Sequence, residues 1–187
     1  MKKLLFIASA LVIGFSSCRG PAGYDGLDGA PGPAGQDGGL VYASAFELIL
    51  DFTPANGFEH VEPYGFDVYP ADVVLVYIKW DDDDVLGPIW RPLNQTAYLD
   101  QGILTYEYDF GTNDNDITEG NVRLYLGGNI ADFSTLDGAY LNDQLFRVVV
   151  VPAEFLETAR LKSKSYEDVT AAFGIEEEDF IKRDLTL

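Results

Sequence analysis

Cysteine, histidine and basic side chains are scarce in this sequence of 187 residues. A single cysteine excludes an intrachain disulfide framework. Twelve Lys and Arg residues stand against 31 Asp and Glu, a formal charge of -19, which argues against nucleic-acid binding because phosphate contacts need basic patches. The only histidine, His60, would leave a histidine-based zinc site with one imidazole, and no G-x-S-x-G motif is present.

Apolar and aromatic residues, in contrast, are plentiful. They make up 47% and 13% of the sequence, enough apolar surface to offset the conformational entropy of one folded domain. The length suits one domain with short appendages.

The N-terminus has the pattern of a secretory signal peptide. Lys2 and Lys3 precede a mostly apolar run over residues 4–13, which is too short to span a membrane. Ser16 and Ser17 then precede Cys18. Residues 1–17 therefore resemble the signal of bacterial lipoproteins, in which the cysteine becomes the acylated N-terminus, although Phe15 stands where Leu is usual.

Lipid attachment at Cys18 also explains a free thiol in an exported protein; the alternative is an ordinary signal with a chance cysteine. Two or three acyl chains hold a protein stably at a membrane. Cleavage removes two lysines, so the mature charge is 12 − 2 = 10 basic against 31 acidic residues, or -21. This charge repels anionic lipid, and we expect the folded part to stand off the bilayer.

Glycine recurs at every third position from Gly20 to Gly38. This pattern resembles the collagen repeat, in which only Gly fits at the axis of three polyproline-like chains. Six triplets span about 55 Å at that helical rise. Either three chains wind into a homotrimeric stalk, or residues 18–39 form an extended spacer. Asp25, Asp28 and Asp37 have no lysine in neighbouring triplets, so ion pairs do not support the trimer.

From residue 40 onward the pattern predicts β-strands. Apolar and polar residues alternate over 42–52 and 103–110, and short β-rich runs lie at 122–126 and 145–151. Residues 73–80 are β-branched and aromatic throughout, which favours a central strand buried on both faces. Weaker candidates are 66–69 and 90–99.

These strands, separated by turn residues and without long crossover helices, predict a mainly β fold for residues 40–187: an antiparallel β-sandwich with one or two short C-terminal helices. Ser165 and Gly174 are expected to cap one helix. Residues 176–183, with acids first and Lys182-Arg183 last, suggest a second.

Most of the chain is similar to a family of small exported lipoproteins that carry a short collagen-like run and a β-rich domain. The resemblance rests on the signal, the glycine repeat and four segments: 72–77 (D-V-V-L-V-Y), 90–93 (W-R-P-L), 146–153 (F-R-V-V-V-V-P-A) and 166–169 (Y-E-D-V). That family has no assigned function, so the resemblance implies anchoring and architecture but no catalytic residues.

Two acidic runs are candidate calcium ligands, because hard cations prefer several oxygen ligands. The candidates follow two predicted strands and are Asp81, Asp82, Asp83 and Asp84 in one run and Asp114, Asp116 and Glu119 in the other. Neither run has the spacing of the twelve-residue calcium loop. The alternative, which we favour, is a pair of solvated charged loops.

Trp80 and Trp90 are candidate ligand-binding residues. Trp80 adjoins the first acidic run and Trp90 follows Gly87-Pro88, so together they suggest a platform for a sugar or peptide. The alternative is that both pack in the core, as most aromatic residues of strands do.

The expected function is therefore a non-enzymatic, lipid-anchored envelope protein, in the outer membrane, whose collagen-like spacer displays a β-sandwich used for binding or structure. Two alternatives remain: a calcium-dependent carbohydrate-binding or carbohydrate-active domain, and a homotrimeric assembly element. No cofactor is expected; calcium is the alternative, if the acidic runs bind it.

Overall fold

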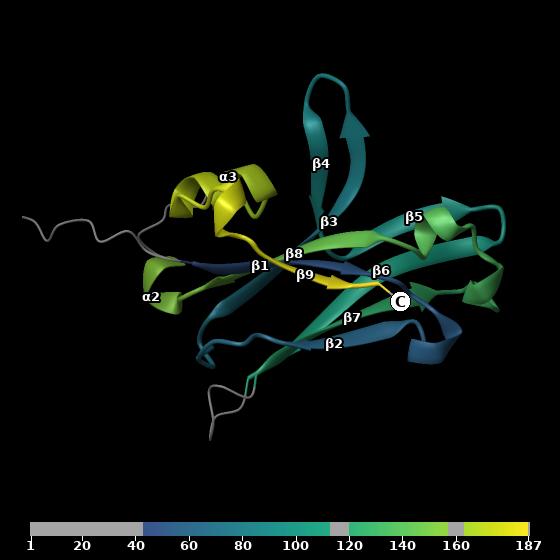
Figure 1. Cartoon of the computed structure of the whole chain (residues 1–187), viewed down its shortest axis with the longest axis horizontal. Coiled ribbons are helices and arrows are strands. Elements are labelled where there is room, and N and C mark those ends of the chain that lie inside the picture. The colour runs from purple at the N-terminus through teal and green to yellow at the C-terminus, as the bar shows by residue number, and fades with distance from the viewer. Residues whose placement is uncertain (1–42, 113–119, 157–162, 187) are drawn as a thin grey trace, which may run out of the picture. The chain divides into compact units, whose positions relative to one another are not determined.

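The computed structural model describes residues 43–112, 120–156 and 163–186 (Figure 1). They belong to one structural unit, Gly39–Leu187. The signal peptide, Cys18, the glycine repeat and the second acidic run with Asp114, Asp116 and Glu119 lie outside the described residues.

Nine strands form two sheets within this described part, in a sandwich-like arrangement (Figure 1). Sheet A has the order β4-β3-β8-β1-β9 and sheet B the order β2-β7-β6-β5. The strands of sheet A are β1 (Ser44–Leu50), β3 (Val73–Asp83), β4 (Gly87–Pro92), β8 (Gln144–Val151) and β9 (Ile181–Leu185). Those of sheet B are β2 (Glu59–Pro63), β5 (Gln95–Leu99), β6 (Gly102–Gly111) and β7 (Asn121–Gly128).

Side-chain alternation divides the apolar residues of sheet A between two cores. Phe146, Val148 and Val150 of β8 face the core between the sheets, whereas Val149 and Val151 face a second core on the outer side of sheet A. An apolar run in a strand is therefore buried on both faces, because each face meets its own core. The same division on β3 confirms that residues 73–80 form a central strand, between β4 and β8.

The second core is covered by helix α3 (Tyr166–Phe173), which lies beside sheet A in Figure 1. The Ser165 hydroxyl accepts a hydrogen bond from the Asp168 amide, and Gly174 ends the helix with φ 62°. Both caps agree with the sequence prediction. Val169 and Phe173 are the buried face of the helix. A shorter helix, α2 (Ala153–Leu156), follows β8.

Short 3₁₀ turns complete the described elements: η1 (Pro54–Asn56), η2 (Phe133–Thr135), η3 (Gly138–Tyr140) and η4 (Glu177–Asp179). Thr53, Asp132 and Asp137 cap the first three through their side-chain oxygens.

The helix predicted over residues 176–183 is wrong. That segment contains η4 and then strand β9, which pairs with β1 in parallel, with Phe46 opposite Ile181 and Leu50 opposite Leu185. The strand fills the open edge of β1, a tertiary contact that outweighs the weak local helix signal. Sheet A is therefore mixed, and the prediction of purely antiparallel sheets is corrected at β9.

The weaker strand candidates have a mixed outcome. Residues 66–69 are not in a strand, whereas 90–99 divide into the end of β4 and all of β5, with Pro92 at the boundary. The pattern also missed β2, an edge strand with mostly polar residues.

Arg183 links sheet A to sheet B. From β9 of sheet A it donates hydrogen bonds to Oε1 of Glu62 (2.7 Å) and to the carbonyl oxygens of Pro63 (2.8 Å) and Tyr64 (2.7 Å). Its guanidinium also lies 4.2 Å from the centre of the Phe46 ring. Glu62 meets His60 with its other oxygen, at 3.0 Å, so the half-buried His60 belongs to this link between the sheets.

Candidate functional site

Trp80 lies at a β-bulge. Lys79 is opposite Trp90 and Asp81 is opposite Ile89, so Trp80 has no residue opposite it on β4. A bulge bends its strand and redirects a side chain. The half-buried Trp80 ring meets Tyr106 edge-on, with 6.2 Å between ring centres, and the guanidinium of Arg91 lies 4.7 Å from the indole centre.

Two cavities of about 510 and 450 Å³ adjoin at this bulge. Five residues line both cavities, and we call this shared surface the Trp80 groove: Lys79, Trp80, Asp81, Ala139 and Gln144. The larger cavity adds three tyrosines, Tyr98, Tyr106 and Tyr140, and the smaller adds two carboxylates, Asp82 and Asp143. Aromatic surface with a few polar groups around it is the usual lining of a small-ligand site.

The first acidic run is not a loop, which corrects that prediction. Asp81, Asp82 and Asp83 belong to β3 and pair with Ile89, Pro88 and Gly87 of β4, and only Asp84 lies in the turn. The extra residue at Trp80 shifts the register, and the hairpin continues beyond it.

Two carboxylates of this run already have partners. Asp82 pairs with Lys79 at 2.7 Å, and Asp83 accepts from the amides of Val85 and Leu86, both at 2.8 Å. Those backbone hydrogen bonds, from Leu86 first and Val85 second, lower the pKa of Asp83. Within residues 43–112, 120–156 and 163–186, no group of three or more His, Cys, Asp or Glu side chains is placed to hold a metal ion.

Trp90 is not beside Trp80. Its ring belongs to the outer core of sheet A and is 8% exposed, whereas Trp80 packs against the core between the sheets. The two tryptophans thus lie on opposite faces of sheet A and form no common platform. Trp90 instead stacks on Tyr166 of α3, with ring centres 5.2 Å apart and planes 28° apart.

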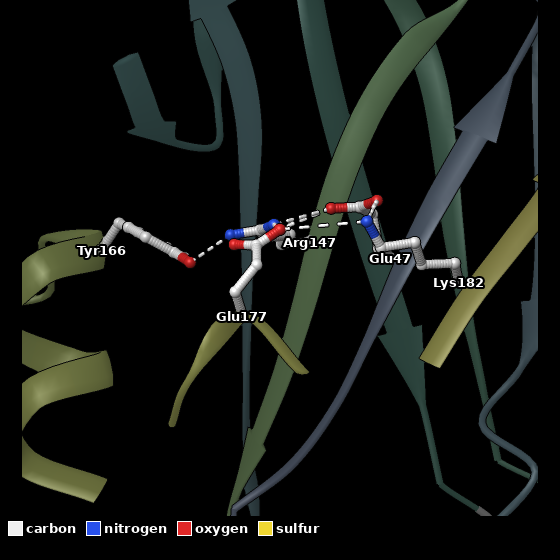
Figure 2. Close-up of polar contacts among 5 residues, drawn as sticks. All are labelled: Glu47, Arg147, Tyr166, Glu177 and Lys182. Carbon is white, nitrogen blue, oxygen red and sulfur yellow. Dashed lines mark hydrogen bonds and ion pairs between the residues drawn. The ribbon is translucent and has the colours of Figure 1, made fainter. Parts of the chain in front are cut away.

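A cluster of charged residues centres on Arg147, whose guanidinium lies over the Trp90 ring. Figure 2 shows its polar contacts. Arg147 of β8 donates from Nε to Oε2 of Glu47 on β1, at 2.9 Å, and both residues are only 3% exposed. Arg147 also donates to the Tyr166 hydroxyl and pairs with Glu177 of η4. Lys182 of β9 approaches the other Glu47 oxygen at 3.7 Å.

Aromatic rings surround the Arg147 guanidinium. Its central carbon lies 4.3 Å from the centre of the Trp90 ring, 4.2 Å from Phe180 and 5.5 Å from Tyr166. Burial by itself lowers the pKa of Arg147, but hydrogen bonds to Glu177 and Glu47 outweigh it and leave the pKa above its usual value. The arginine therefore stays charged, and the ring faces and carboxylates compensate the lost hydration.

This cluster attaches the C-terminal segment to sheet A. Its members come from two neighbouring strands, a helix, a 3₁₀ turn and the edge strand β9. Each of its charged groups faces a protein partner of opposite charge, and the Arg147–Glu47 pair at its centre is buried, so we assign the cluster to structure. The sequence signal was visible: one arginine and one glutamate interrupt otherwise apolar strands, and buried charges require partners.

Comparisons with known proteins add no relative. No protein-family model, no curated protein and no solved structure matches this chain. Among the helices that the structure describes, none has the length and apolar character to cross a membrane.

Proposed function

We propose that this protein is a lipid-anchored cell-envelope protein, held at the outer membrane through Cys18, that displays a non-enzymatic β-sandwich as a binding module. The Trp80 groove is its ligand site, and the ligand is a saccharide or a peptide. One observation carries this assignment: two cavities adjoin at a bulged tryptophan and share its ring. The signal sequence and the glycine repeat support the anchor and the spacer.

The chemistry of the groove favours a neutral saccharide. Aromatic side chains offer flat faces to the C–H side of a sugar ring, and carboxylate and amide groups accept or donate hydrogen bonds at its hydroxyls. Tyr98 is 82% exposed at the larger cavity, so it adds a second accessible aromatic face.

Titration of the mature full-length protein in detergent with neutral oligosaccharides tests this role, with the heat of binding measured by isothermal titration calorimetry as the readout, since it does not depend on Trp80. Trp80→Ala is expected to weaken binding about tenfold or more, since a lost aromatic anchor costs at least about 1.4 kcal/mol. Tyr69→Ala is the matched control, because Tyr69 is an exposed aromatic residue that lines neither cavity. Equal loss in both variants, or no binding at all, rejects the groove.

Lipid attachment at Cys18 is tested separately, by mass spectrometry. The intact mass of the membrane-extracted protein should equal residues 18–187 plus acyl chains. An unmodified mass, or cleavage at another residue, contradicts lipid attachment at Cys18.

A calcium-dependent carbohydrate-binding or carbohydrate-active domain is the second candidate, because Asp81 lines both cavities and Asp82 lines one. Calcium binding would have to break the Lys79–Asp82 pair. Millimolar Ca²⁺ should then raise the melting temperature, since a ligand of the native state stabilises it. An unchanged melting temperature rejects this candidate.

A homotrimer formed through residues 20–38 is a third proposal, supported by the glycine period of the sequence. Mass in solution, measured with and without these residues, distinguishes a trimer from a monomeric spacer.

A further inference from the structure

The hairpin formed by β3 and β4 extends beyond the sheet that carries it. Strand β8 pairs with β3 only from Val73 to Ile78, so the hairpin beyond the bulge has no other strand beside it. Figure 1 shows this hairpin rising clear of both sheets, with its turn at the tip.

Two aliphatic side chains stand at that tip. Val85 is 90% exposed and Leu86 is 76% exposed, the highest values among the large hydrophobic residues that the structure describes, apart from Tyr98. Neither belongs to either core. Exposed apolar groups that project from a surface commonly mark an interaction site.

The turn itself does not need these two residues. The carboxylate of Asp83 holds the amides of Val85 and Leu86, and Gly87 supplies a positive φ of 75°. The turn uses only the backbone amides of residues 85 and 86, together with the side chain of Asp83 and the backbone of Gly87. Serine at positions 85 and 86 would therefore form the same turn. Folding therefore gives no reason for the aliphatic pair.

Edge-to-edge pairing with another strand is blocked on both sides of the hairpin. On β4, Pro88 and Pro92 lack amide donors, and proline on an edge strand prevents strand addition. On β3, Asp81 and Asp83 place charges along the other edge. A partner must therefore contact the side chains of the tip.

We propose that the tip of this hairpin, Val85 and Leu86, docks into an apolar pocket of a partner protein whose rim is basic. The tip is convex, so the partner must be concave. Four consecutive carboxylates, Asp81 to Asp84, directly precede the apolar pair, and of these Asp82 is paired with Lys79. Charge complementarity then requires a basic rim.

The same charges disfavour two other binding partners of the tip, an anionic membrane and a second copy of this chain. An anionic lipid surface repels four carboxylates at the point of insertion. A second copy of this chain carries the same excess of 31 acidic over 12 basic residues, or over 10 after loss of the signal, and would be repelled as well.

Site-specific photocrosslinking tests the proposal in the cells that produce the protein. A photoreactive amino acid replaces Leu86 in the full-length chain, and a second chain carries it at Val61, a half-exposed residue of edge strand β2. The expected result is one discrete protein adduct at position 86 and none at 61. Val85→Ser in the same chain should lower the adduct yield by about fivefold or more, as for an interface hot spot.

Charge is tested separately. Asp84→Lys should reduce the yield as well, and affinity for the identified partner should fall by about tenfold between 0.05 and 0.5 M salt, because exposed charges are screened. Unchanged melting temperatures, within about 2 °C, show that these exposed substitutions leave the fold intact.

Several results would overturn the proposal: no protein adduct, equal adducts at 86 and 61, an adduct with phospholipid, or a crosslinked dimer of this chain. A partner whose binding ignores salt or the Val85→Ser change would overturn it too. Saccharide binding by the purified protein is measured independently, so failure of the Trp80 groove leaves this result standing.

Discussion

Arg147 and Glu47 are 100 residues apart in the chain, yet they stand opposite each other on β8 and β1 and form an ion pair inside the fold. Their positions couple the first strand of sheet A to the C-terminal segment, because Arg147 also binds Tyr166 and Glu177.

Removing one partner of this pair should lower the free energy of unfolding far more than replacing both partners with apolar residues. Glu47→Ala leaves a buried guanidinium with less compensation and is expected to lower the free energy of unfolding by about 3–5 kcal/mol. The double variant Glu47→Leu with Arg147→Met should recover most of that loss, since an apolar pair needs no hydration. Urea denaturation of these variants and of the single variants Glu47→Leu and Arg147→Met provides the comparison; additive losses would show that the two side chains do not act as a pair.

Arg183 should contribute more to stability than its neighbour Lys182. Arg183→Ala removes three hydrogen bonds between the sheets and a contact with the Phe46 ring, at an expected cost of about 2–3 kcal/mol. Lys182 is largely exposed, and its pairs with Glu47 and Glu177 are 3.7 and 3.9 Å long, so Lys182→Ala should cost less than about 1 kcal/mol. Chemical denaturation measures both, and equal costs would contradict the link between the sheets.

Alkaline pH should unfold the domain through its buried tyrosines. Burial raises the pKa of Tyr64, Tyr77 and Tyr106 well above the ordinary value of 10.0, because the phenolate loses its hydration. In the unfolded chain these groups ionise near pH 10, so their contribution to stability is complete below that pH and is lost as pH rises above it.

Absorbance at 295 nm and circular dichroism, recorded together, test this order of events. The buried tyrosines should ionise with unfolding, in one cooperative step. Gradual ionisation of Tyr64, Tyr77 and Tyr106 before loss of structure would be inconsistent with their burial.

Gly128 should not accept alanine. Its φ is +120°, and an added Cβ would lie 2.0 Å from the carbonyl oxygen of Ile103, so a backbone must move. We expect Gly128→Ala to cost more than about 2 kcal/mol, as strained backbone substitutions do. Gly111→Ala is the matched control within sheet B, because nothing lies within 4 Å of its added Cβ. Melting temperatures of the two variants give the answer, and similar values would contradict it.

The strands with strong patterns could be predicted because the order of apolar and polar residues within each strand reflects which of its faces are buried. Alternation identified β1 and β6, and the uninterrupted apolar run identified β3. Strand β2, with Glu59, His60 and Glu62, lacks such a pattern because it lies at the edge of sheet B, where burial is slight. Strand β9 depends on β1 for its conformation, and no local signal reports a neighbour that is distant in the chain.

The candidate site shows the same limit. Composition indicated that Trp80 and Trp90 were of interest, but only register decides which face each one takes. One extra residue at position 80 changes the register, and it separates the two rings onto opposite sides of sheet A. The register shift at Trp80 also lets β3 and β4 continue to pair beyond it, so the acidic residues that follow Trp80 belong to a hairpin.

The neighbours of β1 have a consequence for biogenesis. Both strands that flank it, β8 and β9, come from the later part of the chain. During synthesis, β1 must therefore stay apolar and unpaired until some hundred residues after it have emerged. A holdase chaperone that shields nascent strands would be most needed in that interval, and slow synthesis would raise the aggregation of this chain more than that of a fold whose first strands pair locally.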